Sequence, residues 1–181
     1  EESLQLNRPL TVIHPATVIG DEDAPEVPAT SAIGQLLAQV AAGQMPLVPG
    51  SRHHRVPLVS VGYVARYVGA LIESKDEQGF HEHLLLDPAT PDLLSVMRVL
   101  AHGLQVRAPW GRVPLSWVRA MSAWPALARV IGLEPESLGF IVRGSFDVSR
   151  EAVWAQAQGV SHPDLDQSLR HTAAAWGQAA G

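Results

Sequence analysis

The sequence predicts an α/β fold in which short buried strands alternate with amphipathic helices. Leu10–Ile13 is an apolar, largely β-branched run that suits a buried strand. Leu84–Leu86 is a second all-apolar run, typical of a strand that is covered on both faces of a parallel sheet. Between and after these runs, apolar residues recur at the i, i+3, i+4, i+7 spacing of a helix with one buried face.

The first predicted strand ends in a turn. Pro15 has no N–H for a sheet ladder and so leaves the sheet there, and Gly20 marks a point where the backbone needs a positive φ or a close approach. Open α/β sheets bind ligands at the carboxyl ends of their strands. Residues 8–21 are therefore a candidate ligand-binding segment, and an ordinary structural exit from the sheet is the alternative interpretation.

The middle of the chain predicts two helices and two extended segments. Thr30-Ser31 supplies an N-cap for a helix that stops at Gly43, with an apolar stripe made of Ile33, Leu36, Leu37 and Val40. Residues 45–50 and 56–60 are predicted to be extended. The second of these segments runs into a helix whose stripe consists of Val61, Val64, Ala65, Val68 and Ile72.

The remaining residues predict one exposed stretch and several helices. Residues 73–83 are polar and expected to be exposed. Thr90 as N-cap and Pro91 at the first helical position open a helix that Gly103 closes. The last expected elements are two short helices within the Trp-rich residues 107–132, beginning near Pro114 and Pro125, an extended piece at 140–142, and helices at 147–158 and 163–176.

Composition limits the classes of function. The 181 residues are 46% hydrophobic, which is enough for one domain with a real core. The net charge is −5 and Lys75 is the only lysine, which argues against a nucleic-acid binder or a polybasic membrane segment. The sequence has no cysteine, signal peptide or membrane-spanning stretch. We therefore expect a cytoplasmic protein with neither nucleic-acid nor membrane partners.

Three stretches resemble one enzyme family. HPATVIGD at residues 14–21 is similar to R-P-G-x-V-x-G-D, with His14 in place of Arg and Ala16 in place of Gly. VPLVSVGYVARYV contains a segment similar to V-x-V-D-x-V-A, with Gly62 in place of Asp. The closing FDVSREAVWAQAQGVSHPDLDQSLRHTAAAW includes a similar His-Pro-x-Leu. The chain thus resembles the C-terminal half of extended short-chain dehydrogenases/reductases, in the subgroup of fatty-acyl and thioester reductases.

This resemblance implies the C-terminal part of a Rossmann-like fold, helix-rich with a few short strands, and an NAD- or NADP-dependent reaction on a carbonyl or acyl-thioester substrate. Two parts of that machinery are not in the sequence, and no catalytic residue is predicted here. One is the Gly-rich turn that holds the pyrophosphate, and the other is a proton-donating Tyr with a Lys four residues later. We expect residues 1–181 to be a single substrate-binding region that lacks the N-terminal dinucleotide-binding half. It would work with that half or within a larger chain, which would bind most of the cofactor.

Three groups of residues are candidates for the site. The resemblance implies that Pro15, Ala16, Thr17 and Val18 close over the nicotinamide ring, and His14 is a candidate contact for cofactor or substrate. Within the basic turn at residues 51–55, Arg52 and His53 are candidates for binding an anionic group such as a phosphopantetheine arm, and a solvated turn is the alternative. Trp110, Trp117 and Met121, with Trp124, are candidates for an apolar acyl pocket, and plain core is the alternative.

Other chemistries find less support in the sequence. His81 and His83 would share one face of a strand, but no third ligand of evident spacing accompanies them, so no metal site is predicted. The G-x-S-x-G elbow of many hydrolases does not occur. The alternative to a reductase is a non-catalytic binding or assembly module of the same fold, with His14, Ala16 and Gly62 as the traces of lost chemistry.

Overall fold

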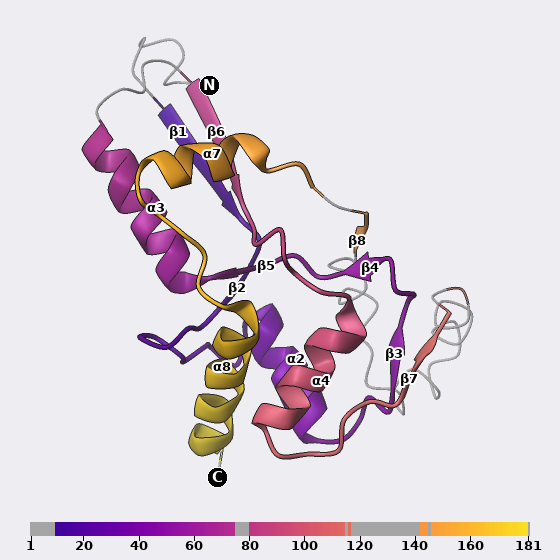
Figure 1. Ribbon diagram of the computed structural model, residues 1–181. Coiled ribbons are helices and arrows are strands. Elements are labelled where there is room, and N and C mark those ends of the chain that lie inside the picture. The colour runs from indigo at the N-terminus through magenta and orange to yellow at the C-terminus, as the bar shows by residue number, and fades with distance from the viewer. Residues whose placement is uncertain (1–9, 75–79, 115, 117–141, 145, 181) are drawn as a thin grey trace.

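The computed structural model of the protein describes residues 10–74, 80–114, 116, 142–144 and 146–180 (Figure 1). In chain order its elements are β1 (Leu10–Pro15), β2 (Thr17–Ile19), α2 (Ala32–Ala41), β3 (Leu47–Pro49), β4 (His54–Arg55), β5 (Leu58–Ser60), α3 (Val61–Ser74), β6 (Phe80–Leu85), α4 (Leu93–Gly103), β7 (Gly111–Val113), β8 (Val142–Arg143), α7 (Ser149–Ala157) and α8 (Leu165–Ala180). The mixed α/β class expected from the sequence is confirmed.

The longest strands, β1 and β6, pair in parallel with Leu10 opposite Phe80 and Pro15 opposite Leu85. Helices α3 and α7 lie beside this pair (Figure 1). Tyr67 of α3 contacts Trp154 of α7, with ring centroids 4.7 Å apart. A buried cluster joins the two helices to β6 and β5 through Val59, Tyr63, Tyr67, Leu85, Ala155 and Val160. The β1–β6 pair is therefore packed against α3 and α7.

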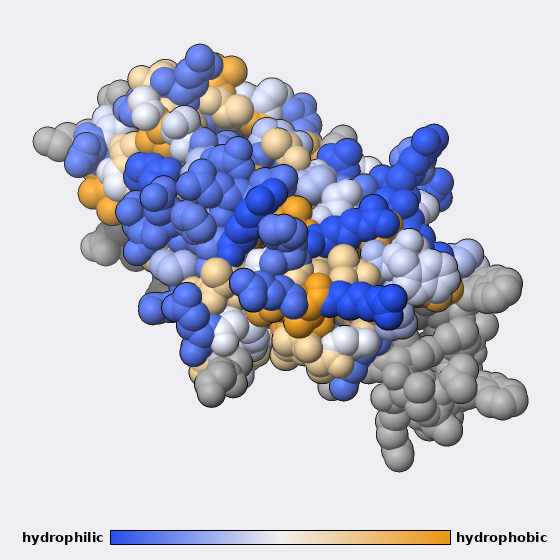
Figure 2. Space-filling view, turned by 60° about the horizontal axis from the view of Figure 1, so that its bottom comes forward, coloured by the Kyte–Doolittle hydropathy of each residue, from blue (hydrophilic) through white to orange (hydrophobic). Residues whose placement is uncertain are grey.

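Helices α2, α4 and α8 gather into a second layer beyond β2 and β5 (Figure 1). Their apolar stripes meet in a core made of Ile19, Ile33, Leu37, Leu58, Val96, Leu100, Leu165, Leu169 and Ala173. The outer surface seen from the side where these helices end is mostly hydrophilic, with small apolar patches (Figure 2). The stripe predicted for α2 is therefore confirmed, whereas the one predicted for α3 is wrong: α3 buries Tyr63 and Tyr67, and Ile72 of the predicted stripe is 75% exposed.

Three further strand pairs are short and connect distant parts of the chain. β2 pairs in parallel with β5, and β3 pairs in parallel with β7. β4 pairs antiparallel with β8, which places His54 opposite Arg143 and Arg55 opposite Val142. Pro57, Val142 and Phe146 thereby reach the same pocket as Pro15 at the end of β1.

Several predicted helix signals are confirmed by the hydrogen bonds. The Ser31 hydroxyl accepts from the N–H of Gly34 at 3.1 Å, which makes Ser31 the N-cap of α2. Gly43, just after α2, has φ of 66°, the left-handed conformation that ends many helices. The extended segment expected at 45–50 contains β3, and that at 56–60 contains β5.

The polar stretch at 73–83 was predicted to be exposed, and this is wrong for its end. β6 begins at Phe80 rather than at Leu84, and the His83 side chain is buried, with 3% exposed. Tyr67 explains the burial, because its hydroxyl lies 3.0 Å from His83 Nδ1 and gives the imidazole a polar partner inside the core.

The start of α4 also differs from the prediction. The N-cap is Asp92, whose Oδ1 accepts from the N–H groups of Leu94 and Ser95, while Thr90 donates its hydroxyl hydrogen to the Asp87 carbonyl in the preceding turn. Gly103 is the last helical residue rather than a terminator. Gln105, with φ of 57°, makes the left-handed turn that ends α4.

The Trp-rich segment was predicted to be helical from residue 107 to 132. Residues 111–113 instead form the strand β7. Residues 115 and 117–132, with most of the two predicted helices, lie outside the described residues. Among the residues that are described, no helix is long and apolar enough to cross a membrane.

Candidate functional site

A pocket lies where the chain leaves β1. The N–H of Ala16 donates to the Leu85 carbonyl at 2.9 Å, and the N–H of the next residue, Thr17, donates to the Pro57 carbonyl at 3.1 Å. The backbone therefore changes partner within one step, from β6 to the segment that enters β5. This change of partner lies at the carboxyl end of β1, and open α/β sheets bind ligands at the carboxyl ends of their strands.

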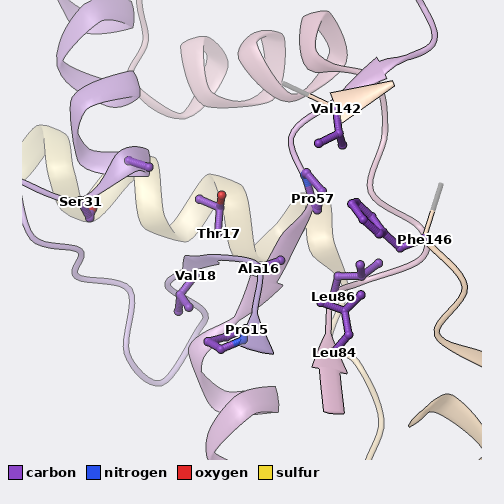
Figure 3. A pocket seen from close by; sticks show the side chains of 11 residues that line it. Pro15, Ala16, Thr17, Val18, Ser31, Pro57, Leu84, Leu86, Val142 and Phe146 are labelled. Carbon is purple, nitrogen blue, oxygen red and sulfur yellow. The ribbon is translucent and has the colours of Figure 1, made fainter. Parts of the chain in front are cut away.

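The pocket has a volume of about 460 Å³, within the usual range of small-molecule sites. Figure 3 shows Thr17 and Val18 on one side of it and Leu86 and Phe146 on the other. Its lining residues are Pro15, Ala16, Thr17, Val18, Ser31, Ala32, Pro57, Leu84, Leu86, Val142 and Phe146. Residues far apart in the chain thus form one concave surface.

The lining of this pocket is mainly apolar. Its side-chain polar groups are the hydroxyls of Thr17 and Ser31. Ser31 already donates to the Pro28 carbonyl at 2.7 Å and accepts from the N–H of Gly34, so its hydroxyl serves the α2 cap. The Thr17 hydroxyl has no hydrogen-bond partner among the described residues and is the polar group open to a ligand. The described lining holds no titratable side chain.

No protein-family model and no curated protein matches the sequence. Solved structures do match. The terminal R domain from the myxalamid PKS-NRPS biosynthetic pathway is 16% identical, with a TM-score of 0.64 over 99% of this chain and 46% of its own. RMD from Pseudomonas aeruginosa, complexed with NADPH, is 15% identical, with a TM-score of 0.59 over 97% and 50%. UDP-glucose-4-epimerase from Stenotrophomonas maltophila, with bound NAD, is 18% identical, with a TM-score of 0.59 over 96% and 49%.

The fold is that of the C-terminal half of an extended short-chain dehydrogenase/reductase. The chain spans about half the length of the solved structures that it matches. At these identities, from 15% to 18%, the likeness establishes the fold alone.

The four residues predicted to face the nicotinamide all line the pocket. Pro15, Ala16, Thr17 and Val18 form a continuous wall, because they cover the step from β1 to β2. Within a short-chain dehydrogenase/reductase fold, this wall lies at the carboxyl end of the parallel sheet. The structure thus gathers these residues at one surface.

His14 lies next to this wall but does not line the pocket. Its Nε2 is 3.6 Å from Glu82 Oε1 on the neighbouring strand, and both side chains are more than half exposed. Such an exposed pair contributes little to stability.

Arg52 and His53 of the basic turn are exposed, and neither lines the pocket. Arg52 and His53 contact each other, with Arg52 Nε 3.4 Å from His53 Nε2. The turn leads into β4, which pairs with β8, and Val142 of β8 lines the pocket. The same pairing adds Arg143 to the basic turn, a residue that the sequence pattern did not single out.

Trp110 belongs to a different cavity. Its side chain is 73% exposed, and it lines a space of about 470 Å³ together with Val40, Gly43, Met45, Pro46, Arg107, Ala108 and Pro109. The structure does not bring Trp110 to the pocket at the end of β1. Trp117, Met121 and Trp124 lie outside the described residues.

The far wall of the pocket was not predicted from the sequence. Pro57, Leu84, Leu86, Val142 and Phe146 come from three separate segments that meet only in the folded chain. Their local patterns indicate strands or loop ends and carry no signal for a shared surface. The one available signal is the pairing of β4 with β8, which is too short to predict from periodicity.

A polar cluster inside the fold stands apart from the pocket. The His162 ring stacks on Tyr63 with centroids 3.6 Å apart, and its Nδ1 lies 3.8 Å from Asp87 Oδ2. Burial lowers the pKa of His162, while Asp87 opposes and Arg66 adds to that effect. Burial, with the charges of Asp87 and Glu151, raises the pKa of Tyr63. Among the described residues, no three His, Cys, Asp or Glu side chains form a metal site.

Proposed function

We propose that this chain is the substrate-binding portion of an NAD(P)-dependent reductase or dehydrogenase that acts on a carbonyl or acyl-thioester substrate. The observation that carries the proposal is the pocket at the end of β1, whose wall is made by Pro15, Ala16, Thr17 and Val18. Comparable folds include proteins crystallised with NADPH and with NAD. A nicotinamide cofactor supplies or accepts a hydride, and the wall of this chain would hold its ring against the substrate.

The residues of the wall suit a nicotinamide ring. Pro15, Ala16 and Val18 offer an apolar surface to the face of the ring. The proposal places the pyrophosphate site and the proton donor in a nucleotide-binding half, either the protein's own N-terminal half or part of a larger chain. This division agrees with a sequence that lacks both the Gly-rich turn and the Tyr–Lys pair.

The substrate would approach from the side of the basic turn. Arg52 and His53 would meet an anionic part of a small or carrier-bound substrate, and His14 would lie near the reacting end. Trp110, Trp117 and Met121 remain candidates for further substrate contacts. Of these, only Trp110 has a described position, in a cavity other than this pocket.

Mass and cofactor binding test the proposal. We expect intact-mass measurement of the protein from its native cells to reveal a form heavier than 19.4 kDa, because that form includes a nucleotide-binding half. Saturating NADPH or NADH should raise the melting temperature of that form, because a ligand at about 100 times its Kd adds ~2.7 kcal/mol to the free energy of unfolding. No shift with either cofactor at millimolar concentration would contradict the proposal.

A matched pair of variants locates the effect at the wall. Ala16→Leu places a larger side chain in the pocket and should reduce the cofactor-induced shift, while Ala38→Leu makes the same change at an exposed position of α2 and should leave it unchanged. Equal shifts in both variants would mean that the wall does not contact the cofactor.

The second candidate is a non-catalytic binding or assembly module with the same fold. The observation that favours it is the absence of any titratable side chain from the described pocket lining, together with the replacements His14, Ala16 and Gly62. A native mass near 19.4 kDa, with ligand binding but no cofactor effect, would support this alternative.

A further inference from the structure

A second, smaller cavity adjoins the pocket. It has a volume of about 80 Å³ and is lined by Arg55, Pro57, Leu86, Asp87, Pro88, Thr90, Gly144 and Phe146. Pro57, Leu86 and Phe146 line both spaces. Pro57 and Leu86 are held by adjacent backbone hydrogen bonds, since the Pro57 carbonyl accepts from Thr17 and the N–H of Asp87 donates to the Leu58 carbonyl at 2.7 Å. Phe146 borders both spaces from outside this framework.

The Phe146 side chain is 46% exposed and stands at the edge of the pocket opposite Thr17 and Val18 (Figure 3). It follows β8 and precedes α7, so it belongs to neither element. A large aromatic side chain in this position separates the pocket from the smaller cavity without being part of the core.

The chemistry of the lining selects the ligand. A hydroxyl-rich ligand such as a sugar gives up hydrogen bonds to water when it enters, and each lost bond must be replaced. Here the Ser31 hydroxyl is engaged in the α2 cap, and Thr17 offers one hydroxyl. One hydroxyl matches a single ligand oxygen and leaves the rest of the ligand against proline, alanine, leucine, valine and phenylalanine side chains.

The polar residues that line the smaller cavity are Arg55, Asp87 and Thr90. Its polar residues already have backbone partners: Asp87 Oδ1 accepts from the N–H of Ala89 at 2.8 Å, and Thr90 donates its hydroxyl hydrogen to the Asp87 carbonyl at 2.7 Å. Arg55 Nη1 donates to the Thr90 carbonyl at 3.1 Å. An apolar chain that enters beside Phe146 leaves these bonds in place.

We propose that the pocket binds the apolar chain of a carbonyl compound and that Phe146 sets the longest chain it accepts. This inference rests on the proposed function, because it places the carbonyl at the wall made by Pro15, Ala16, Thr17 and Val18 and directs the chain toward Phe146. The substrate class is an aliphatic or aryl-aliphatic ketone, aldehyde or thioester acyl group rather than a sugar nucleotide.

Direct binding of linear methyl ketones of increasing length to the protein, without cofactor, tests this proposal by calorimetry. Methyl ketones carry the carbonyl but do not form imines as readily as aldehydes. We expect the affinity to rise about fourfold for each added methylene, the factor for burying one CH₂, and to stop rising when the chain reaches Phe146. Phe146→Ala should move this limit to longer chains by a few carbons, and Phe146→Trp should move it to shorter chains.

Phe80 provides the matched control. Its side chain is also 46% exposed, but it starts β6 and does not line either cavity, so Phe80→Ala should leave the length limit where it is. Circular dichroism of each variant establishes that it is folded. The Trp variant, which removes no apolar group, gives a readout even if the Ala variant is unstable.

The outcomes separate this proposal from the proposed function. A length limit that moves with Phe146 and not with Phe80 supports the proposal, whether or not NADPH has an effect. An unmoved limit, no ketone binding, or preferential binding of a sugar nucleotide overturns it. If NADPH stabilises the longer form but the chain-length limit for ketones is the same in all variants, the proposed function stands and this assignment of the pocket does not.

Discussion

Asp21 and Gly62 form a complementary pair at the start of α3. The buried Asp21 carboxylate accepts from the N–H of Gly62 at 2.8 Å through Oδ2 and from the N–H of Ala24 at 3.1 Å through Oδ1. Ser60 caps the next N–H, that of Tyr63, at 3.2 Å. The resemblance to extended short-chain dehydrogenases/reductases placed an Asp at residue 62, and the apparent loss of a capping group is compensated here by a carboxylate from the loop after β2.

The close contact between these residues predicts strong coupling. A Cβ at residue 62 would overlap the Asp21 carboxylate, so Gly62→Ala should cost ~1–3 kcal/mol of unfolding free energy despite the better helix propensity of Ala. Asp21→Ala alone should cost ~1 kcal/mol as a lost cap. In the Asp21→Ala background, Gly62→Ala should instead be neutral or stabilising by up to ~1 kcal/mol. Additive effects in urea denaturation would show that the two residues are not coupled.

His162 predicts a dependence of stability on pH. Burial lowers its pKa in the folded protein below the ordinary value of about 6.5, so the unfolded chain binds more protons as the pH falls below that value. The contribution of neutral His162 to the free energy of unfolding is therefore complete above about pH 6.5. It is lost as the pH falls through the pKa of His162 in the folded protein. Relative to His162→Gln, the wild-type protein should lose stability at up to ~1.4 kcal/mol per pH unit in that window.

Asp87 supplies the control for this pH dependence. Its carboxylate, 3.8 Å from His162 Nδ1, favours the charged imidazole and opposes the effect of burial. Asp87→Asn should therefore lower the pKa of His162 further and extend the acid-induced loss of stability to lower pH. NMR titration of the His162 ring protons gives the pKa directly, and an unshifted or raised value in the wild-type protein would refute the prediction.

At the scale of elements, periodicity predicts the helices well and their ends less well. The stripe of α2 is correct because a buried helix face leaves a repeating apolar signal, but α3 buries Tyr63 and Tyr67 in place of its predicted stripe. The ends depend on single hydrogen bonds, as at Asp92, which caps α4 in place of Thr90. His83 was unpredictable for a related reason, since its burial requires Tyr67 from another element.

Gly103 was predicted to end its helix, but in the structure its lack of a side chain allows α4 and α8 to approach closely. A Cβ at Gly103 would lie 2.7 Å from the Cβ of Ala173 and 3.2 Å from the Arg170 carbonyl oxygen, so α4 and α8 approach closely at this point. Gly103→Ala should cost ~1–3 kcal/mol. Gly69→Ala in α3, where a Cβ meets nothing within 4 Å, should be neutral or stabilising by up to ~1 kcal/mol.

The reciprocal change distinguishes packing from a conformational requirement. If contact with Ala173 causes the cost, Ala173→Gly should recover part of the stability lost in Gly103→Ala, because it removes the opposing Cβ. Thermal or urea unfolding of the single and double variants measures this. No recovery in the double variant would assign the cost to the backbone of Gly103 or to the Arg170 carbonyl.

At the scale of the whole molecule, the near wall of the pocket is predictable from sequence and the far wall is not. Pro15, Ala16, Thr17 and Val18 are consecutive, so a strand followed by a turn already suggests them. Phe146 and Leu86 reach the same surface only through the pairing of β4 with β8 and the path of the chain after β6. Local patterns describe each element but not which elements meet.

The two edges of β1 differ, and this difference tests whether a nucleotide-binding half pairs with β1, as the proposed function requires. The N–H of Ala16 points toward β6. Because the N–H groups of successive residues in a strand point to opposite edges, the N–H of His14 also faces β6 and that of Ile13 faces the other edge. Pro15, which has no N–H, occupies this opposite edge, where a proline is tolerated. Among the described residues, β6 is the strand that pairs with β1.

Amide hydrogen exchange measures the protection of each edge of β1 separately. In the 181-residue chain, the amide of Ile13 should exchange faster than that of His14 by roughly tenfold or more, because the His14 amide is within the β1–β6 ladder. In a longer polypeptide with a nucleotide-binding half, a strand added beside β1 should protect Ile13 to a similar degree as His14. If Ile13 and His14 are already equally protected in the 181-residue chain, β1 has two neighbours without any further half, and this face does not need the partner that the reductase proposal requires.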